Sequence, residues 1–451
     1  MLACVLAGGC RIDFTPIQLD SAVSPDAVFG SHGDTGAQNA YAVDVGKDGS
    51  IAVVGAFENG LPFGSGLRTQ GAQDAYVASL YPDGRLRWIR DLGGISDDVA
   101  SGVAIDDAGN VTVTGHFTAT VDFGTGPLDA LGEEDIFLAS YARDGTPRWA
   151  HRFGDTASGT PYGSDLGQAL AVERATGELY LGGQFTGTVD FGTGPMTMTS
   201  TGDDVVLASF DRDGVIRWAD HYGGGQLNKV AGITVDATGV VFTGYFQGTA
   251  SFGGAALVTH GTNDIFVASY TRDGSFRWST SFGGTGLDFG RGVALDVDGN
   301  AYVTGYYQGT VDFGAGPETA PGVLDGFVAS LTSTGTYRWS HTFGAPCAKG
   351  EDVVSVSGRV YVVGQFDGAL QRPALAGQGP GDGFVLAYDN AGGESSSLAY
   401  GGPGYDAAFA SAALPGGDLV VVGEIGGPDT CASTTGPRAE EDMFVVRTSL
   451  P

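Results

Sequence analysis

Short apolar runs bounded by Gly, Asp and Asn recur along the chain, and helical periodicity is nowhere evident. One stretch reads RGVALD at 291–296, VDGN at 297–300 and AYVTGYY at 301–307, and two more apolar runs follow at 327–331 and 337–343. Asp-Gly and Thr-Gly pairs between β-rich runs indicate hairpins, because the favoured two-residue turns need positive φ. The pattern predicts a unit of four short antiparallel strands.

Two markers repeat in the same register along the chain. The first is an Arg-Trp pair, which contains every tryptophan: Trp88, Trp149, Trp218, Trp278 and Trp339. The second is an aspartate that opens an apolar run: Asp74, Asp135, Asp204, Asp264, Asp325, Asp382 and Asp442. Seven repeats of about sixty residues, with four strands in each, predict an all-β fold, a seven-bladed β-propeller of four-stranded antiparallel blades.

The two ends of the chain complement each other. The last repeat reaches its third strand at 442–450, and the sequence Ala-Val-Phe-Gly at 27–30 matches the end of a fourth strand, as at 278–283. We expect residues 23–30 to form the outer strand of the seventh blade and to close the ring, because an unpaired sheet edge is a liability. Residues 23–451 are therefore expected to form one propeller domain.

The repeat resembles a known family. FGGTGLDFGRGVALDVDGNAYVTGYY at 282–307 and DGFVA at 325–329 are similar to the repeat of bacterial seven-bladed β-propeller (SBBP-type) proteins, and the resemblance covers residues 27–451. The last two repeats depart from the other five by lacking the Arg-Trp pair. The resemblance implies an exported or cell-surface protein with no assigned reaction, and it supplies neither a ligand nor catalytic residues.

Charge narrows the classes of partner. Among 451 residues, 22 Lys and Arg stand against 52 Asp and Glu, which gives a net charge of −30. Nucleic acids and anionic membrane surfaces are disfavoured, because both need cationic patches. Cations and neutral surfaces such as glycans stay open, and the charge can equally serve solubility alone. No apolar run is long enough to predict a transmembrane helix.

The N-terminus reads MLACVLAGGC at 1–10, which resembles the end of a bacterial lipoprotein signal peptide. In this interpretation residues 1–9 are the remnant of the signal, Cys10 is lipidated and residues 10–22 are a linker, so the protein is a lipoprotein of the cell envelope. Two features depart from the pattern: a basic N-terminal region is missing, and Ala7 stands where leucine is usual. The alternative is an N-terminal stub without a targeting role.

Residues present once per repeat are most simply structural. The strand-opening aspartates are expected to accept backbone N–H groups in turns, and the tryptophans are expected to pack blade against blade. A second polar set precedes the first strands: Asp98, Asp165, Asp288, Asp352 and Asp406, with Asn228 and Gly36 at the matching places elsewhere. A ring of such oxygen ligands suits calcium. The favoured alternative is that each carboxylate caps a strand.

Cysteine usage adds one cross-link candidate. Besides Cys4 and Cys10, the chain has Cys347 and Cys431, and such a pair in an exported protein predicts a disulfide. Two free thiols are the alternative. The six histidines form no metal-binding pattern, and no HExxH, GxSxG or phosphate-binding loop is present in the sequence.

The connections differ between the two faces of the predicted ring. First-to-second and third-to-fourth turns are tight, whereas second-to-third and fourth-to-first connections are long and should carry function. We call the latter side the long-loop face. The third repeat is extended there, which makes Gly154, Asp155, Tyr162 and Asp165 candidates for a ligand-binding loop.

The sequence favours a non-catalytic, monomeric binding scaffold that recognises a glycan or a protein with its long-loop face. A passive structural or surface-coat protein without a ligand is the alternative. A propeller enzyme, of the quinone-dependent dehydrogenase or lyase kind, is least favoured, because bases, arginines and metal ligands do not concentrate at one place in the sequence.

Overall fold

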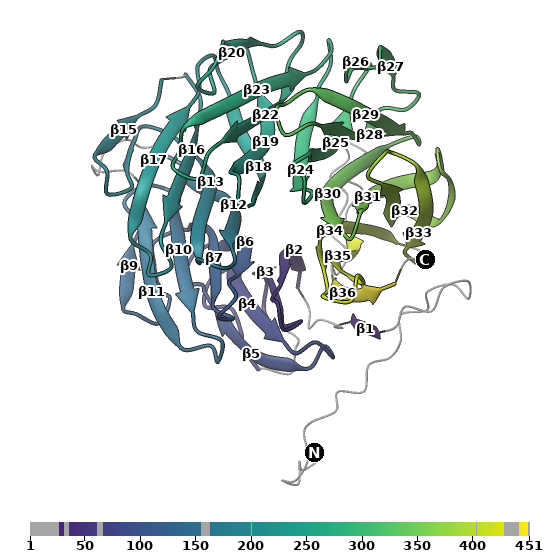
Figure 1. Cartoon of the computed structure of the whole chain (residues 1–451). Coiled ribbons are helices and arrows are strands. Elements are labelled where there is room, and N and C mark those ends of the chain that lie inside the picture. Colours follow the sequence, from purple (N-terminus) through teal and green to yellow (C-terminus); the bar gives the residue numbers. More distant parts are fainter. Residues whose placement is uncertain are drawn as a thin grey trace.

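The computed structural model describes residues 27–30, 36–60, 66–154, 163–199, 201–402, 404–427 and 442–449. These residues form β-strands and turns and contain no helix, and thus no helix that could span a membrane. Five separate four-stranded antiparallel sheets and one eight-stranded sheet succeed one another around a central opening (Figure 1).

Each of the five sheets is built from one sequence repeat. The first contains β2 (Gln38–Val45), β3 (Ile51–Phe57), β4 (Asp74–Leu80) and β5 (Leu86–Asp91). The second contains β6 (Val99–Ile105), β7 (Val111–Phe117), β10 (Asp135–Tyr141) and β11 (Pro147–Phe153). The third contains β12 (Leu166–Glu173), β13 (Glu178–Phe185), β16 (Asp204–Phe210) and β17 (Ile216–Tyr222). The fourth contains β18 (Asn228–Val235), β19 (Val240–Phe246), β22 (Asp264–Tyr270) and β23 (Phe276–Phe282), and the fifth β24 (Phe289–Leu295), β25 (Ala301–Tyr307), β28 (Asp325–Leu331) and β29 (Tyr337–Phe343).

The eight-stranded sheet consists of two four-stranded units. One unit holds β30 (Ala348–Val356), β31 (Arg359–Gln371), β32 (Ala374–Asp389) and β33 (Glu394–Tyr400). The other holds β34 (Tyr405–Ala413), β35 (Leu419–Gly427), β36 (Asp442–Thr448) and, from the N-terminal part of the chain, β1 (Ala27–Gly30). The units meet at a single parallel pair, Gly381 and Tyr405. β1 runs antiparallel to β36, with Ala27 opposite Arg447.

Four small hairpins interrupt the second-to-third connections. They are β8 (Thr120–Asp122) with β9 (Pro127–Asp129), β14 (Thr188–Asp190) with β15 (Pro195–Thr197), β20 (Thr249–Ala250) with β21 (Leu257–Val258), and β26 (Thr310–Asp312) with β27 (Pro317–Thr319). In the first hairpin one oxygen of Asp122 accepts the N–H groups of Gly124 and Gly126. Both glycines have positive φ, which explains their place in the motif.

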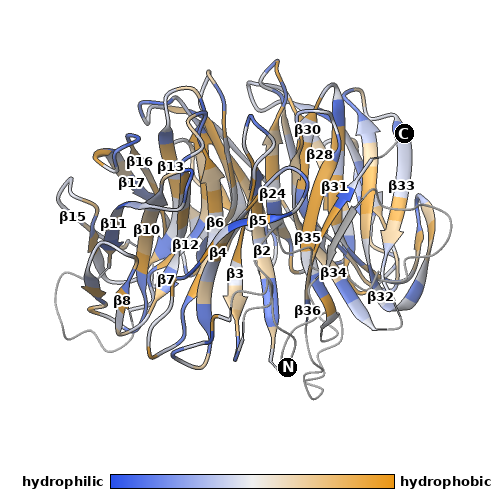
Figure 2. Ribbon diagram, turned by 90° about the horizontal axis from the view of Figure 1, so that it is seen from below, coloured by the Kyte–Doolittle hydropathy of each residue, from blue (hydrophilic) through white to orange (hydrophobic). Residues whose placement is uncertain are grey.

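The hydrophobic core lies between neighbouring sheets. The third strands β4, β10, β16, β22 and β28 are buried along their whole length, because a sheet faces them on either side. Val54 of the first sheet, for example, shares a cluster with Val113 and Phe137 of the second. Val53 shares another with Val422 of β35. Figure 2 shows apolar strand centres between polar connections, the distribution expected for this packing.

The first strand of each unit, β2, β6, β12, β18, β24, β30 or β34, lies innermost (Figure 1). Each contains a β-bulge, at which one extra residue faces a single partner position on the second strand. The extra residues are Tyr41, Ser101, Gln168, Ala231, Arg291, Glu351 and Phe409. A bulge kinks the strand and re-aims the side chains around it, so these strands define which residues face the opening.

Candidate functional site

The strand-opening aspartates serve the backbone. Asp74 is fully buried, and its carboxylate accepts the N–H groups of Gln70 at 2.7 Å and Gly71 at 3.2 Å. Asp382 accepts those of Gln378 and Gly379 in the same way. Such bonds fix the end of the long second-to-third connection, which agrees with the structural role expected from the repeat.

Among the described residues, a glycine beside six of the seven strand-opening aspartates, all except Asp442, leaves room for the carboxylate. A Cβ atom on Gly223 would lie 2.0 Å from Oδ1 of Asp204, and one on Gly283 would lie 2.1 Å from Cγ of Asp264. The second glycine of the pair approaches backbone instead, since a Cβ on Gly284 would lie 2.0 Å from the carbonyl oxygen of Thr310. The Gly-Gly motif therefore follows from close packing.

The predicted metal ligands that precede the first strands are also engaged by backbone. Asp98 is fully buried and accepts the N–H groups of Gly94 at 2.7 Å and Thr118 at 3.0 Å. Asp288 makes the equivalent bonds to Gly284 and Gln308. The same position in the other repeats behaves alike: Asp165 accepts Thr186 N–H, Asp406 accepts Gly402 and Gly426 N–H, and the Asn228 amide donates to Asp203 and Gly224 carbonyls.

Asp352 does not belong to this set. The bulge places it immediately after the extra residue Glu351, whereas Asp98 stands four residues before the corresponding Gly102. The true counterparts of Asp98 are Ala348 in the sixth unit and Gln38 in the first. The prediction that Asp352 and Gly36 occupy the position of Asp98 was therefore wrong. Asp352 lies four residues after that position, and Gly36 lies two residues before it. The structure does not bring the five carboxylates together. In the described part of the chain no three His, Cys, Asp or Glu residues form a group that could hold a metal ion.

Burial alters the acidity of these carboxylates. It raises the pKa of Asp98 to about 7 and that of Asp288 to about 6, against the hydrogen bonds that lower both. The buried carboxylate is costly in its charged form, because the surrounding protein solvates it less well than water. These groups therefore couple the stability of the fold to pH.

Several predicted site residues lie outside the described residues: Cys10 and the rest of 1–22, Asp155, Tyr162 and Cys431. Of the remaining loop candidates, Gly154 packs against the Asp135 carboxylate. Asp165, as described above, is held by backbone. Cys347 is buried and disulfide-bonded; its pairing with Cys431 stays a prediction.

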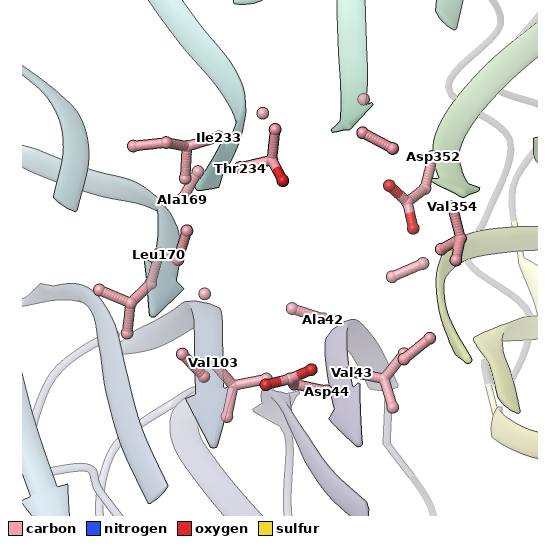
Figure 3. A pocket seen from close by; sticks show the side chains of 18 of the residues that line it. Ala42, Val43, Asp44, Val103, Ala169, Leu170, Ile233, Thr234, Asp352 and Val354 are labelled. Atoms are coloured by element: carbon pink, nitrogen blue, oxygen red, sulfur yellow. The ribbon is translucent and has the colours of Figure 1, made fainter. Parts of the chain in front are cut away.

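The central opening is a cavity of about 1200 Å³ lined by the first strands of all units. Figure 3 looks into it, with Val103, Leu170 and Ile233 on one side and Val354 on another. The cavity has three zones along its axis. They are a rim at the long-loop face, where the first strands begin, an aliphatic belt in the middle, and a mouth at the tight-turn face.

The rim carries polar groups that the protein leaves without partners. The Arg291 guanidinium donates through Nε to Glu351 at 2.8 Å, while its two Nη groups have no acceptor in the described structure, and the side chain is 42% exposed. Gln184 is 2% exposed, and its Oε1 has no hydrogen-bond partner among the described residues. Nδ1 of His116 is likewise unpaired there, whereas its Nε2 lies 3.8 Å from Glu134.

Aromatic side chains accompany these groups. The Tyr245 ring lies 4.5 Å from that of Phe289, which lies 4.9 Å from that of Tyr306, measured between ring centroids. Tyr41 and Phe409, from the first and last units, face each other at 6.3 Å. Tyr41, Phe409 and Tyr245 line the cavity directly. The rim thus offers flat apolar faces next to free hydrogen-bonding groups.

The mouth at the tight-turn face is bridged by one arginine. Arg174 donates to the carbonyl oxygens of Val45 at 2.8 Å and Ile105 at 3.0 Å and pairs with Asp44 at 2.6 Å. It therefore ties three units together. Lys47 and Asp107 form a second ion pair, 3.3 Å long, at this mouth. The third unit can reach across because its first strand, β12, extends to Glu173.

The sequence did not reveal that basic residues meet in the channel. Lys229 and Arg291 belong to different repeats and look isolated along the chain, yet both line the cavity. A signal existed in the bulge register, because it places Arg291 in phase with Tyr41 and Phe409.

Comparison with known proteins supports the repeat assignment. A family model described as SBBP, beta-propeller repeat, matches residues 277–306, which confirms the resemblance predicted from the sequence for that repeat. A curated relative, "Regulatory protein FlaEY" of Caulobacter vibrioides, is 25% identical over 341 residues, covering 69% of this chain and 34% of that protein. The "Uncharacterized WD repeat-containing protein L264" of Acanthamoeba polyphaga mimivirus is 28% identical over 126 residues, 24% of this chain and 9% of that protein.

Solved structures with similar architecture have little sequence identity. The WD40 β-propeller domain of Doa1 has a TM-score of 0.49 at 10% identity, with 94% of this chain and 96% of that one covered. A PQQ-bound aldose sugar dehydrogenase from Streptomyces coelicolor has a TM-score of 0.37 at 11% identity, with 77% and 93% covered.

Proposed function

We propose that this chain is a non-catalytic β-propeller that binds a glycan in its central channel, entered from the long-loop face. The proposal includes a single closed ring of seven four-stranded units in which β1 completes the last unit. It rests on one observation above others: the rim of a repeat-built channel gathers unpartnered polar groups and aromatic faces, among them Arg291, Gln184 and Tyr245.

The chemistry of the rim suits a sugar. A pyranose presents hydroxyl groups, which act as both donors and acceptors, and apolar C–H faces, which pack on aromatic rings. Unpaired Nη groups of Arg291 supply donors, Oε1 of Gln184 supplies an acceptor, and Tyr245 supplies a ring. Concave sites with a few fixed polar groups among apolar walls are the usual form of small-ligand sites.

Charge in the channel is balanced, although the whole chain carries −30. Four basic and four acidic side chains line the cavity: Lys47, Arg174, Lys229 and Arg291 against Asp44, Asp107, Glu351 and Asp352. A lining without net charge does not favour polyanions such as nucleic acid. Most of these charged side chains are paired with each other. Two planar side chains, the Arg291 guanidinium and the Gln184 amide, keep hydrogen-bonding atoms available for a ligand.

A binding role is also favoured over catalysis. His116 is the one histidine among the described channel-lining residues, and it contacts Glu134 and no serine or cysteine, so the Ser-His pair of acyl transfer is missing there. The regulatory designation of the Caulobacter relative is compatible with a protein that binds. We also propose export to the cell envelope with lipidation at Cys10; metabolic labelling with a palmitate analogue should be lost in Cys10→Ala.

A glycan array with a channel-blocking variant tests the proposal. Ala231 stands at the bulge position that holds Tyr41 and Phe409 in other units, so Ala231→Phe should fold and should fill the rim. Val297→Phe introduces the same side chain at a fully exposed turn and is the matched control. We expect array binding by the wild type and Val297→Phe, and its loss in Ala231→Phe at an unchanged melting temperature. Binding that survives in Ala231→Phe places the site elsewhere, and a blank array with and without calcium favours the passive structural role.

A further inference from the structure

One position in the channel breaks the symmetry of the repeats. The residue after the bulge is small in six units: Ala42, Gly102, Ala169, Gly232, Gly292 and Ala410. Small residues suit this position because neighbouring first strands approach closely there; a Cβ on Gly292 would lie 2.8 Å from Cα of Asp352. In the sixth unit the position is Asp352, whose carboxylate projects into the channel (Figure 3).

A second exception stands beside the first. One residue further along, six units carry an aliphatic side chain of the channel belt: Val43, Val103, Leu170, Ile233, Val293 and Val353. The seventh unit has Ser411 instead. Its N–H and its hydroxyl donate to Oδ2 of Asp352 at 2.8 Å and 3.1 Å. The two departures from the repeat are therefore in contact, and together they make one polar spot in an aliphatic belt.

Asp352 has no cationic partner in the described structure. Each basic residue that lines the channel is paired with another acid: Lys47 with Asp107 at 3.3 Å, Arg174 with Asp44 at 2.6 Å, Lys229 with Asp203 at 3.7 Å and Arg291 with Glu351 at 2.8 Å. Glu351, on the same strand, is the charged group that acts on Asp352, and Ser411 is its neighbour on β34. Burial and the nearby Glu351 raise the pKa of Asp352 to about 6.

An unpaired carboxylate in such surroundings is costly, and a cation that reaches it is correspondingly favoured. A hydrogen bond between ammonium and carboxylate is about twice as strong as one between neutral groups. The negative field of the whole chain also attracts cations toward the channel. A neutral sugar would leave this carboxylate compensated only by its neutral hydrogen-bond donors, the N–H and hydroxyl of Ser411.

We infer that Asp352 binds the protonated amine of the ligand, so that the glycan selected by the channel carries a free amino sugar. The inference rests on the proposed function and names its ligand class. In this arrangement the sugar ring lies at the rim and belt, its ammonium group donates to Asp352, and Ser411 holds the carboxylate in place.

Calorimetric titration with defined oligosaccharides tests the assignment. The probes are tetramers of glucosamine, of N-acetylglucosamine and of glucose at pH 6.5, where much of the glucosamine amine is protonated; they share backbone chemistry but differ in charge at carbon 2. We expect the glucosamine tetramer to bind at least about tenfold more tightly than the other two. Asp352→Ala installs the residue found in other units and should reduce this preference to within about twofold, as should the near-isosteric Asp352→Asn. Glu318→Ala removes an equal charge from the exposed hairpin β26–β27 and should leave the preference unchanged.

The possible results separate the inference from the proposed function. If the neutral tetramers bind as well as the amine, and Ala231→Phe abolishes binding, the channel is a glycan site but Asp352 does not select amines. If the amine preference persists in Asp352→Asn, general electrostatic attraction causes it and the inference is overturned. If none of the tetramers binds and the array is blank, both proposals fail. A preference for the amine that weakens as the pH falls below about 6, in the wild type only, supports the role of the carboxylate.

Discussion

The indole N–H of Trp278, on β23 of the fourth sheet, donates a hydrogen bond of 3.0 Å to the carbonyl oxygen of Ser333, in the turn between β28 and β29 of the fifth sheet. Gly335 of the same turn packs on the indole face, where a Cβ would lie 2.7 Å from the ring. The other four tryptophans make the same contact with the next unit: Trp88 with Arg143, Trp149 with Arg212, Trp218 with Arg272 and Trp339 with Asn390.

This contact explains why the sixth unit has no tryptophan at the equivalent position. In the sixth unit the equivalent position, opposite Ala387, is Ser396. The next unit combines β36 with β1 from the other end of the sequence, so no turn connects its third and fourth strands. A tryptophan at 396 would have no such turn to bind.

Replacement of Trp278 by phenylalanine should remove the hydrogen bond and keep most of the packing. We expect the free energy of unfolding to fall by about 1 kcal/mol, the usual net worth of one such bond. Urea denaturation followed by circular dichroism measures it, with Val297→Ala at a fully exposed site as the control. Equal stability of Trp278→Phe and wild type would show that packing alone matters.

Addition of one methyl group at Gly223 should be severely destabilising. The new Cβ would lie 2.0 Å from Oδ1 of Asp204, which is itself fully buried. We expect Gly223→Ala to lower the free energy of unfolding by about 3 kcal/mol, at the upper end of the range for overpacking. Gly416 has no atom within 4 Å of a Cβ, so Gly416→Ala is the control and should leave the urea midpoint unchanged. A tolerated Gly223→Ala would mean that the carboxylate moves freely.

Stability should decline as the pH rises from about 4 to 7. Burial raises the pKa of Asp98 to about 7 and that of Asp288 to about 6, from 3.8. The folded protein therefore holds protons that the unfolded chain releases, so the stabilisation present below pH 4 is lost as the pH passes through the raised values. The melting temperature should be higher at pH 5 than at pH 8.

Asp98→Asn isolates the contribution of one carboxyl to that decline. The variant cannot titrate, so the difference in melting temperature between pH 5 and pH 8 should shrink relative to the wild type. Glu318→Gln, on the exposed hairpin β26–β27, is the control and should keep the full difference. A slope that is the same in Asp98→Asn would assign the pH dependence to general repulsion among the acids.

Removal of β1 should weaken the last unit. A chain that starts at residue 27 keeps the pairing of Ala27 with Arg447, whereas one that starts at residue 31 exposes the edge of β36. We expect the shorter chain to lose about 2–4 kcal/mol, since several backbone hydrogen bonds at about 1 kcal/mol each are broken, and to aggregate through the open edge. Thermal unfolding with light scattering compares the two, and coincident curves would contradict a closing role for β1.

Cys347 should be found linked to Cys431. Peptide mapping by mass spectrometry without reduction is expected to recover one cross-linked pair, and Cys431→Ser should lower the free energy of unfolding by up to about 4 kcal/mol, since the bridge closes a long loop. Chemical reduction of the disulfide in the wild type should lower the free energy of unfolding by the same amount. Recovery of Cys347 with another cysteine would contradict the predicted pairing.

Much of the architecture could be predicted from sequence because the repeat markers carry local backbone chemistry. An aspartate that caps a loop and a glycine that leaves room for it act within one unit, so Asp204 and Gly223 mark the strands they serve wherever the unit lies. Pairing of 27–30 with the last repeat was also predictable, because a missing fourth strand and an orphan match to one are both visible in the sequence.

The candidate site was decided by tertiary structure. Asp352 lies four positions further along its first strand than Asp98 does, and a bulge between these positions reverses which side chains face the channel. Arg291, Gln184 and Tyr245 come from three repeats and meet only because the units surround one axis. The sequence by itself determined the units and their caps, which depend on neighbours a few residues away. Only the packing of the units around the channel decided which side chains remain unpartnered, because that depends on contacts between residues about sixty or more positions apart.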